Sequence, residues 1–330
     1  METIFDKALI AAHRHRALAS NDPKAAFLLD IAAEEMAERL AVVERTFETA
    51  VELHGATGAA ARAALATGKI GTMIRVESEK AYAGPSETLI EAPLEDVPLE
   101  QQSANLILAP LSLHLTNDTP GVFIQIRRAL KPDGLFMAAI PGAGTLQELR
   151  HVLLATEVEM TGGASPRVIP FADVRDVGSL MQRAGFTLPV IDAENYTVRY
   201  DSLFPLMRDL RAMGMSNPLA VRARMPLTRA FFLRAAEIYA ERYSDPDGRI
   251  RATFERRRDG EGRSTFDVVV QKLLGMEAKL AQYRDGAVFV RTVERTVGRD
   301  GLNAVWAGPE NLPNAREIAD ARAWVRRVHG

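Results

Sequence analysis

Two acidic residues and two glycines stand where a strand and its following turn would contact a cofactor. Glu52 ends a short apolar run, and the turn after it contains Gly55 and Gly58. Glu77 ends another apolar run further along the chain. A carboxylate binds a cationic group or the hydroxyls of a ribose, and glycine lets the backbone approach a ligand closely. We therefore predict a nucleotide-type cofactor site that contains all four residues.

This set of residues matches what a methyl donor such as S-adenosylmethionine requires of an open parallel sheet. Glu52 would receive the cationic end of the donor, and Glu77 would bind the hydroxyls of its ribose. Each residue also has a structural interpretation, because many glycine turns are only tight connections and many strand-end acids are solvated. The ordered set of acid, glycine turn and second acid favours the cofactor site.

The elements around these residues alternate between strand and helix patterns. A strand buried on both faces is a continuous apolar run, whereas a surface helix repeats apolar residues at intervals of three and four. Alternation with short turns favours parallel crossovers and an open, doubly wound α/β sheet. Strands are predicted at 49–53, 70–76, 87–91, 105–109 and 135–140, and helices at 24–46, 59–66 and 120–130.

After Gly142 the pattern becomes mainly helical. Helices are predicted at 145–160, 171–183, 203–213, 226–242 and 318–328, and late strands at 186–191 and 196–200. The histidines and arginines at positions 13 to 16 are expected on a solvated helix face. A charged, glycine-containing run at 255–263 is the best linker candidate.

These patterns divide the chain into three parts. An N-terminal helical segment covers 1–45, a main domain covers 46–255, and a small helical appendage covers 256–330. Within the main domain, 46–142 is the cofactor half and 143–255 is the helical substrate part.

Composition narrows the classes of function. The chain is 47% hydrophobic and 25% charged, as soluble globular proteins are, and its net charge of −2 gives no reason to expect nucleic acid as a partner. Cysteine is absent, which excludes disulfides, thiolate zinc sites and cysteine nucleophiles and fits a cytoplasmic location. No apolar run approaches the roughly 18 residues of a membrane span. We predict neither a metal site nor a membrane span.

Several short words of the sequence resemble a known class of enzymes. The segment ALKPDGLF at 129–136 resembles the turn before the fifth strand of class I S-adenosylmethionine-dependent methyltransferases. The wider chain, roughly 1–255, resembles the bacterial relatives of the mitochondrial complex I assembly factor of methyltransferase fold, related in turn to malonyl-carrier-protein methyltransferases. The matching words are IFDKAL at 4–9, LSLH at 111–114, GGASPR at 162–167, PFADVRD at 170–176, LMRDLR at 206–211 and AEIY at 236–239.

The resemblance implies a Rossmann-like, mostly parallel seven-stranded sheet with helical additions and S-adenosylmethionine as cofactor. It also marks departures from the family's pattern. His54 stands at the first glycine position of the turn, so that Gly55 is one place out of register. The acid expected near the adenine aligns with Pro93, and Glu95 lies close by. Leu111 completes the implied cofactor contacts, together with His54, Gly55 and Glu95.

His114 is the candidate catalytic acid or base, and a structural histidine after the fourth strand is the alternative. The relatives' antiparallel last strand continues apolar after an Ala-Thr-Phe-Glu sequence. Here 252–255 runs straight into three arginines, which cannot fill a central strand. The segment TFDVVV at 265–270 is predicted to supply that strand instead, with a frayed sheet as the alternative.

The tail resembles a second family. QYRDG at 282–286, NAVW at 303–306 and AWVRRVHG at 323–330 are similar to the carboxyl end of an actinobacterial family of zincin-like metalloproteases. Such enzymes need a His-Glu-x-x-His helix that supplies two imidazoles and a glutamate base. The sequence contains no such motif, since no two of its six histidines are four residues apart. The chain thus resembles a fusion of two families near 253–255.

Three functions remain open at this point. The first is a methyltransferase that moves a methyl group from S-adenosylmethionine to an O or N nucleophile of a small molecule or protein. The second is a non-methylating, hydroxylase-like assembly factor that engages a respiratory complex I subunit. The third is an inactive scaffold in which the altered turn no longer binds the cofactor.

Overall fold

The structure, a computed structural model, describes residues 3–20, 22–163, 165–187, 189–223, 225–255, 289, 292–298, 301–306, 308 and 311–329. The chain forms two compact units, Met1–Asp259 and Gly260–Gly330, and each is considered by itself. Within the described ranges, no helix is long and apolar enough to cross a membrane.

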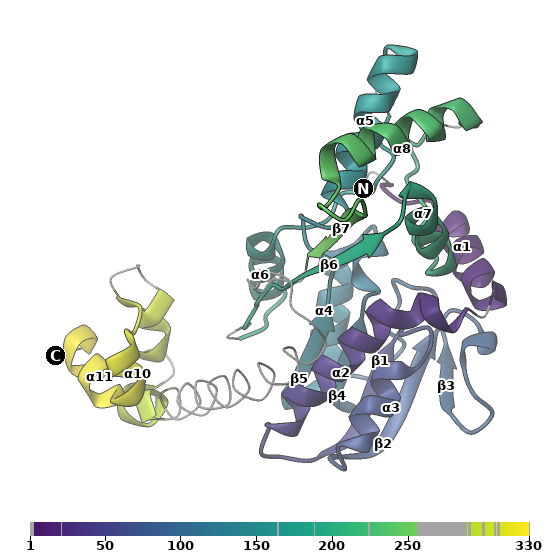
Figure 1. Ribbon diagram of the computed structural model, residues 1–330. Coiled ribbons are helices and arrows are strands. Elements are labelled where there is room, and N and C mark those ends of the chain that lie inside the picture. The colour runs from purple at the N-terminus through teal and green to yellow at the C-terminus, as the bar shows by residue number, and fades with distance from the viewer. Residues whose placement is uncertain are drawn as a thin grey trace. The chain divides into compact units, whose positions relative to one another are not determined.

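A five-stranded parallel sheet is the centre of the first unit (Figure 1). Its order is β3-β2-β1-β4-β5, so the chain runs outward from β1 to β3 and then returns to the other side of β1. Strand order therefore reverses between β1 and β4, which is where open α/β sheets bind ligands. The strands are β1 (Phe47–Leu53), β2 (Ile70–Glu77), β3 (Thr88–Glu91), β4 (Ala104–Pro110) and β5 (Leu130–Ala139).

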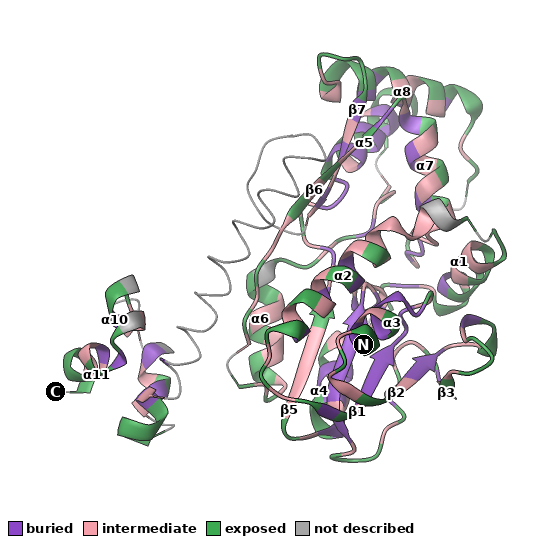
Figure 2. Cartoon of the chain, turned by 60° about the horizontal axis from the view of Figure 1, so that its bottom comes forward, coloured by how far each residue is buried: buried purple, intermediate pink, exposed green. Residues whose placement is uncertain are grey.

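Helices cover both faces of this sheet. On one face, α2 (Phe27–Ala41) and α3 (Ala59–Ala66) pack against alternate residues of β1 and β4, including Ala50 and Leu106. On the other face, α4 (Thr119–Ala129) and α6 (Val174–Arg183) cover residues such as Val51 and Ile107. Figure 2 shows the resulting burial, with β1 mainly buried and the outer strand β5 mostly half-buried. The doubly wound, Rossmann-like arrangement predicted from the sequence is thus confirmed.

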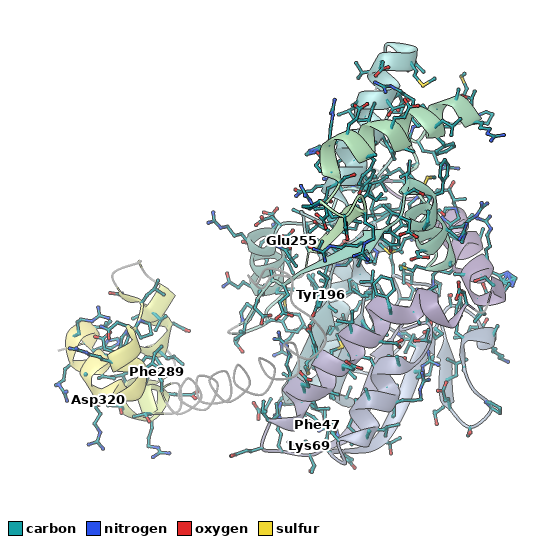
Figure 3. The ribbon with its side chains drawn as sticks, in the orientation of Figure 1. Phe47, Lys69, Tyr196, Glu255, Phe289 and Asp320 are labelled. Carbon is teal, nitrogen blue, oxygen red and sulfur yellow. The ribbon has the colours of Figure 1, made fainter. Side chains whose placement is uncertain are left out.

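A second layer lies at the carboxyl end of the sheet and forms a cap. It contains α5 (Gln147–Thr161), α7 (Leu203–Ala212), α8 (Arg229–Tyr243) and an antiparallel pair of strands, β6 (Asn195–Tyr200) and β7 (Ile250–Glu255). Their shared core includes Leu206, Ile238 and Tyr239. Figure 3 labels Phe47 and Lys69 at the amino ends of the parallel strands, and Tyr196 and Glu255 in this cap.

The first helix, α1 (Lys7–Ser20), packs beside the cap rather than on the sheet. Ile10 joins Phe5, Ile169 and Leu219 in a small apolar cluster. His13, which was expected on a solvated face, is buried. The expectation failed because the turn after α7 approaches the helix so closely that a Cβ on Gly214 would lie 3.4 Å from the His13 carbonyl oxygen.

Two predictions about strands need correction. The segment 186–191 forms no strand in its described residues, because Phe186 is held by ring contacts with Phe123 and Phe136 instead of by strand pairing. The described strands also form a five-stranded and a two-stranded sheet rather than one sheet of seven. The predicted strand at 265–270 lies outside the described residues.

The described part of the second unit contains its own small core. It includes Phe289, Val293, Leu302 and Trp324, and the indole of Trp324 donates a hydrogen bond to the Asn311 carbonyl oxygen at 2.7 Å. Two short helices, α10 (Ala315–Ala319) and α11 (Ala321–His329), belong to this unit, and a short 3-10 turn spans Ala304–Trp306. Asn314 and Glu317 form a reciprocal cap at the start of α10.

Candidate functional site

The turn after β1 has the backbone of a glycine-rich loop although two of its residues are not glycine. His54 and Ala56 both have φ of 54°, and Gly58 has φ of 67° at the start of α3. Left-handed backbone of this kind is strained for residues with a Cβ, so glycine is the usual choice. Gly55 is required for another reason: a Cβ there would lie 2.5 Å from the Glu52 carboxyl carbon. The turn therefore keeps the conformation that the family's glycines allow.

Arg75 is a buried cation on β2 beneath this turn. Its Nε donates to Glu52 at 2.6 Å, and its two terminal nitrogens donate to Glu77, Glu87 and the carbonyl oxygens of Tyr82 and Ala56. All five N–H groups of the guanidinium thus have partners, with 2% of the side chain exposed. The Glu52 carboxylate is fully buried, and its second oxygen accepts from the Ala61 amide at 2.8 Å. Each of its two oxygens therefore has a partner within the protein.

Glu77 ends β2 beside the same turn and is fully buried. One oxygen accepts from the Ala56 amide at 2.6 Å and from Arg75 at 3.1 Å. The other accepts from Arg14 of α1 at 2.9 Å. Burial raises the pKa of Glu77 to about 6, against the lowering effect of the two arginines. The position is that predicted for the ribose acid, and protein cations occupy it.

Glu95 lies after β3 and binds the N-terminal segment. Its carboxylate accepts from Lys7 of α1 at 2.8 Å and from the Asn117 amide at 2.7 Å. Burial acts to raise the pKa of Glu95, but these two partners together lower it below its ordinary value. Asn117 in turn accepts from the amides of Ile4 and Phe5 at 2.8 Å. Glu95 therefore connects the adenine side of the predicted site to the N-terminus.

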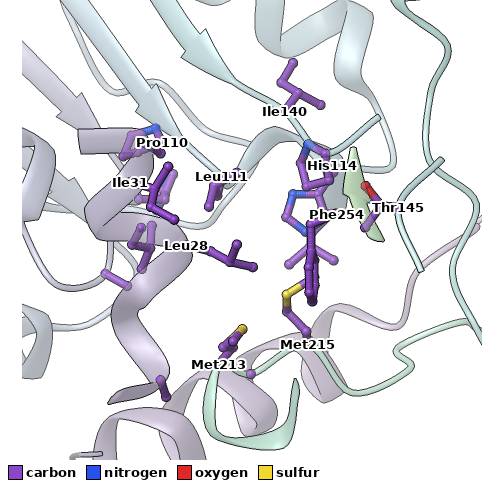
Figure 4. A pocket seen from close by; sticks show the side chains of 18 of the residues that line it. Leu28, Ile31, Pro110, Leu111, His114, Ile140, Thr145, Met213, Met215 and Phe254 are labelled. Carbon is purple, nitrogen blue, oxygen red and sulfur yellow. The ribbon is translucent and has the colours of Figure 1, made fainter. Parts of the chain in front are cut away.

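A pocket opens at the carboxyl ends of β1 and β4, between the sheet and the cap (Figure 4). Figure 4 shows Leu28 and Leu111 on one side and His114 and Phe254 on the other. The space between these walls, including the part open to solvent, amounts to about 980 Å³. Its walls are mainly apolar. The polar side chains in them are Arg14, His54, His114, Thr145, Tyr196 and Glu255.

Two histidines that line this pocket have ring nitrogens without hydrogen-bond partners in the described part of the chain. Neither ring nitrogen of His54 or of His114 has a hydrogen-bond partner among the described residues. Burial and the nearby Arg14 lower the pKa of His54 to about 3 and that of His114 to about 4. Both rings are therefore neutral at pH 7, and each can donate one hydrogen bond and accept one.

Glu255 contributes the only pocket carboxylate among the described residues. It ends β7, and its carboxylate accepts from the Gly144 amide. Its own amide donates to the Thr145 hydroxyl at 3.1 Å, which fixes the cap strand against the loop after β5. Within the described ranges no three His, Asp or Glu residues are placed to hold a metal ion.

The structure brings together most of the residues predicted from the sequence. His54, Leu111 and His114 line the pocket, and Glu77 lies next to His54, whose Nδ1 is 3.9 Å from a Glu77 oxygen. Gly55 and Gly58 belong to the turn, Glu52 lies against Gly55, and Glu95 is paired with Lys7 of α1. The prediction missed Arg75 and Arg14. A charged residue inside the apolar run IRV at 74–76 was the available signal for Arg75.

These atoms fit a cofactor with a ribose and an aliphatic, charged end. The unpartnered nitrogens of His54, His114 and Arg14 are buried donors or acceptors at one cavity, which is what a polar ligand would satisfy. Glu77 is adjacent and is held by only one bond to a residue outside β2 and the turn.

Two family models match the chain. A model described as a methyltransferase domain matches residues 34–138, which contain the whole parallel sheet except the last residue of β5. A second, described as a zincin-like metallopeptidase, matches residues 246–325. Much of the second match falls outside the described residues.

Relatives match over longer stretches. A mitochondrial arginine-hydroxylase, NDUFAF5, from Homo sapiens is 36% identical over 76% of this chain and 74% of its own length. The Dictyostelium discoideum protein of the same name is 42% identical, over 52% of this chain and 39% of that protein. A malonyl-[acyl-carrier protein] O-methyltransferase from Laribacter hongkongensis is 31% identical over 76% of this chain and 87% of its own length. The YcgJ protein of Bacillus subtilis resembles the fold with a TM-score of 0.46 at 12% identity, covering 68% of this chain and 98% of its own.

Proposed function

Because the chain belongs to the methyltransferase-domain family that includes arginine-hydroxylase NDUFAF5 and malonyl-[acyl-carrier protein] O-methyltransferase, we propose that it is an S-adenosylmethionine-dependent methyltransferase. The acceptor is an O or N nucleophile of a small molecule or a protein. The observation that carries the proposal is the pocket at the strand-order reversal, which is lined by three side chains with buried, unpartnered nitrogens. The methyltransferase-domain match over residues 34–138, which covers most of the cofactor half, supports the same conclusion.

Glu77 and the turn after β1 would hold the cofactor's nucleoside, and Leu111 would contact its aliphatic part. When bound, the cofactor supplies an electrophilic methyl group on a sulfonium, which is already a good leaving group. The protein's main task is then to place the acceptor in line with that methyl group and to keep water out. The apolar wall formed by Leu28, Phe254 and Met215 suits an acceptor with an apolar body.

His54 and His114 are available to handle the acceptor's proton. Each neutral ring offers one nitrogen that accepts a hydrogen bond from an O–H or N–H group. Their lowered pKa values make both rings weak bases at pH 7, so a hydrogen bond that orients the acceptor is the larger contribution.

Calorimetric titration of the full chain with S-adenosylmethionine tests the proposal. We expect saturable binding that the Glu77→Gln variant weakens by about tenfold or more, because a hydrogen-bond acceptor for the ribose is removed. Glu91→Gln is the matched control, since Glu91 is exposed at the end of the adjacent strand in register with Glu77. Absence of heat at millimolar ligand would contradict the proposal and favour an inactive scaffold.

The second candidate function is assembly of a respiratory complex without methyl transfer. The sequence identity to the arginine-hydroxylase relatives, 36% over 259 residues, exceeds the 28 to 31% seen with the methyltransferase relatives. On this hypothesis the protein engages a complex I subunit, and the pocket receives one of its side chains.

Capture experiments separate the two candidates. The full chain, tagged and bound to a resin, would retain a complex I subunit that mass spectrometry identifies, and the retention would not depend on added S-adenosylmethionine. The acceptor-side variant Glu255→Gln would weaken retention if the pocket receives a cationic side chain, whereas Glu91→Gln would not. Recovery of no complex I subunit contradicts the assembly function.

A further inference from the structure

Two acids of the predicted nucleoside site are ion-paired to one helix. Arg14 of α1 donates to Glu77 at 2.9 Å, and Lys7 of α1 donates to Glu95 at 2.8 Å. The two basic residues are separated by two helical turns and so lie on the same side of the helix. Helix α1 thus reaches from the carboxyl end of β2 to the loop after β3, across the positions expected for a ribose and an adenine.

The cations of this site differ in how firmly they are bound. Arg75 has a partner for every N–H group, whereas Arg14 has one good hydrogen bond and a second, at 3.4 Å, to the His54 carbonyl oxygen. The Nε of Arg14 is buried without a hydrogen-bond partner in the described part of the chain. Its guanidinium also lies over the Tyr82 ring, 5.1 Å from the centroid. Displacing Arg14 therefore costs far less than displacing Arg75.

Contacts other than these two ion pairs also hold α1 in place. Ile10 packs with Phe5 and Leu219, and the Asp6 carbonyl and carboxylate cap the helix at Ile10 and Leu9. Lys7 is 64% exposed and Arg14 is 12% exposed, so both side chains have a path to solvent. The helix can therefore release the two acids and remain attached through these other contacts, although less firmly than with both ion pairs.

We propose that α1 is a strap over the nucleoside half of the site, held by the Arg14–Glu77 and Lys7–Glu95 ion pairs, and that a ligand with a vicinal diol binds by displacing Arg14 from Glu77. The inference rests on the proposed function for the identity of the ligand. It adds that the free protein keeps the ribose position closed. When no ligand is present, Arg14 thereby pairs with the Glu77 oxygen that Arg75 does not contact.

Adenosine is the probe, because it carries the diol, and 2′,3′-dideoxyadenosine is the control ligand that lacks it. Titrations use the full chain, the double variant K7Q/R14Q, and R16Q as a control that removes an exposed cation from the same helix. We expect K7Q/R14Q to bind adenosine about tenfold more tightly than the wild type. Binding of dideoxyadenosine should change much less, and R16Q should match the wild type.

Hydrogen exchange of the backbone amides of α1 provides a readout that needs no ligand. We expect faster exchange over 7–20 in K7Q/R14Q than in the wild type and R16Q, with β1 and β4 unchanged. Weaker or equal adenosine binding by the double variant overturns the proposal, because Arg14 would then bind the ligand. If no protein binds adenosine or S-adenosylmethionine, the proposed function fails. In that case, faster exchange over 7–20 in K7Q/R14Q still supports the strap, and unchanged exchange contradicts it.

Discussion

The Nε of Arg75 lies 2.6 Å from a carboxylate oxygen of Glu52, and both side chains are almost completely buried. One charge comes from the middle of β2 and the other from the end of β1, in register as direct neighbours. Burying two charges is costly unless the pair and its remaining donors and acceptors are satisfied, and here they are. The pair therefore fixes the turn after β1 from below.

Replacement of Arg75 by alanine should lower the free energy of unfolding strongly. Glu52 and Glu77 would lose a shared cation while remaining buried, and breaking such a network costs about 3–5 kcal/mol. Arg62→Ala is the control, because Arg62 is exposed and its guanidinium donates to the Thr57 carbonyl oxygen of the same turn. Urea unfolding followed by circular dichroism measures both. A loss no larger than that of the control would show that the network is not a source of stability.

The strained turn predicts opposite effects of glycine at two nearby alanines. Ala56→Gly should stabilise the protein by about 0.5–1 kcal/mol, because glycine adopts φ of 54° without strain and this gain exceeds its entropic cost. Ala63→Gly, inside α3, should destabilise it by about 1 kcal/mol. Thermal or urea unfolding distinguishes the signs. Destabilisation by both changes would mean that the Ala56 methyl contributes packing that outweighs the strain.

The strands of the parallel sheet were predictable because each is indicated by neighbouring residues in the sequence. Continuous apolar runs indicated β1, β2, β3 and β4 to within two residues of their observed ends, and glycine or proline turns separated them. The turn predicted at 131–134 lies inside β5, as an irregularity of that strand, so the strand begins five residues before the predicted start at 135. This irregularity interrupts the pairing of β5 with β4, which passes from Ala104–Leu130 directly to Leu106–Leu135, and Asp133 within it has φ of 62°.

The predictions that failed depend on contacts between distant parts of the chain. The apolar residues at 186–191 resemble a strand, but Phe186 is half-buried and packs against rings from α4 and β5 instead of taking part in backbone pairing. The charges of α1 resemble a solvated face, but Arg14 meets Glu77 from 63 residues away. The spacing of polar residues in a helix shows which of its faces is polar. It does not indicate which distant segment supplies the ion-pair partners that bury that face.

The sequence predicted where the residues of the candidate site lie, but it did not predict which side chains pair with the acids there. The order of acids and glycines located the turn and the strand ends. The engagement of Glu52 by Arg75 could not be deduced from their spacing, because it depends on the parallel pairing of β1 with β2 in this register. A lone arginine in a buried strand nevertheless requires acidic partners, and the two strand-end glutamates were the nearest candidates.

Glu77 should give the protein a distinctive pH dependence. Its folded-state pKa of about 6 exceeds its ordinary value of 4.5, so between these values the folded protein holds a proton that the unfolded chain has released. The free energy of unfolding should therefore fall by about 2 kcal/mol as pH rises through this range. Urea unfolding at each pH gives the free energy of unfolding of the wild type and of Glu77→Gln, and the difference between the two isolates the effect of Glu77. Glu91→Gln is the control. A difference that is constant from pH 4.5 to 6.5 would contradict the raised pKa.

The titration of His114 should change the free energy of unfolding with pH in the opposite direction to that of Glu77. Burial lowers its pKa to about 4, whereas the unfolded chain binds a proton near pH 6.5. The stability that the neutral ring contributes is present above pH 6.5 and is lost as pH falls toward 4, by about 3 kcal/mol in all. His114→Gln should reduce the slope by this contribution and leave the part that comes from the lowered pKa of His54, whereas His15→Gln, at an exposed site on α1, should keep the full slope. Unfolding of the three proteins from pH 4 to 7 measures the difference. If His114→Gln retains the wild-type slope, the ring takes up a proton in the folded protein, and its role as a neutral hydrogen-bonding group in the pocket is wrong.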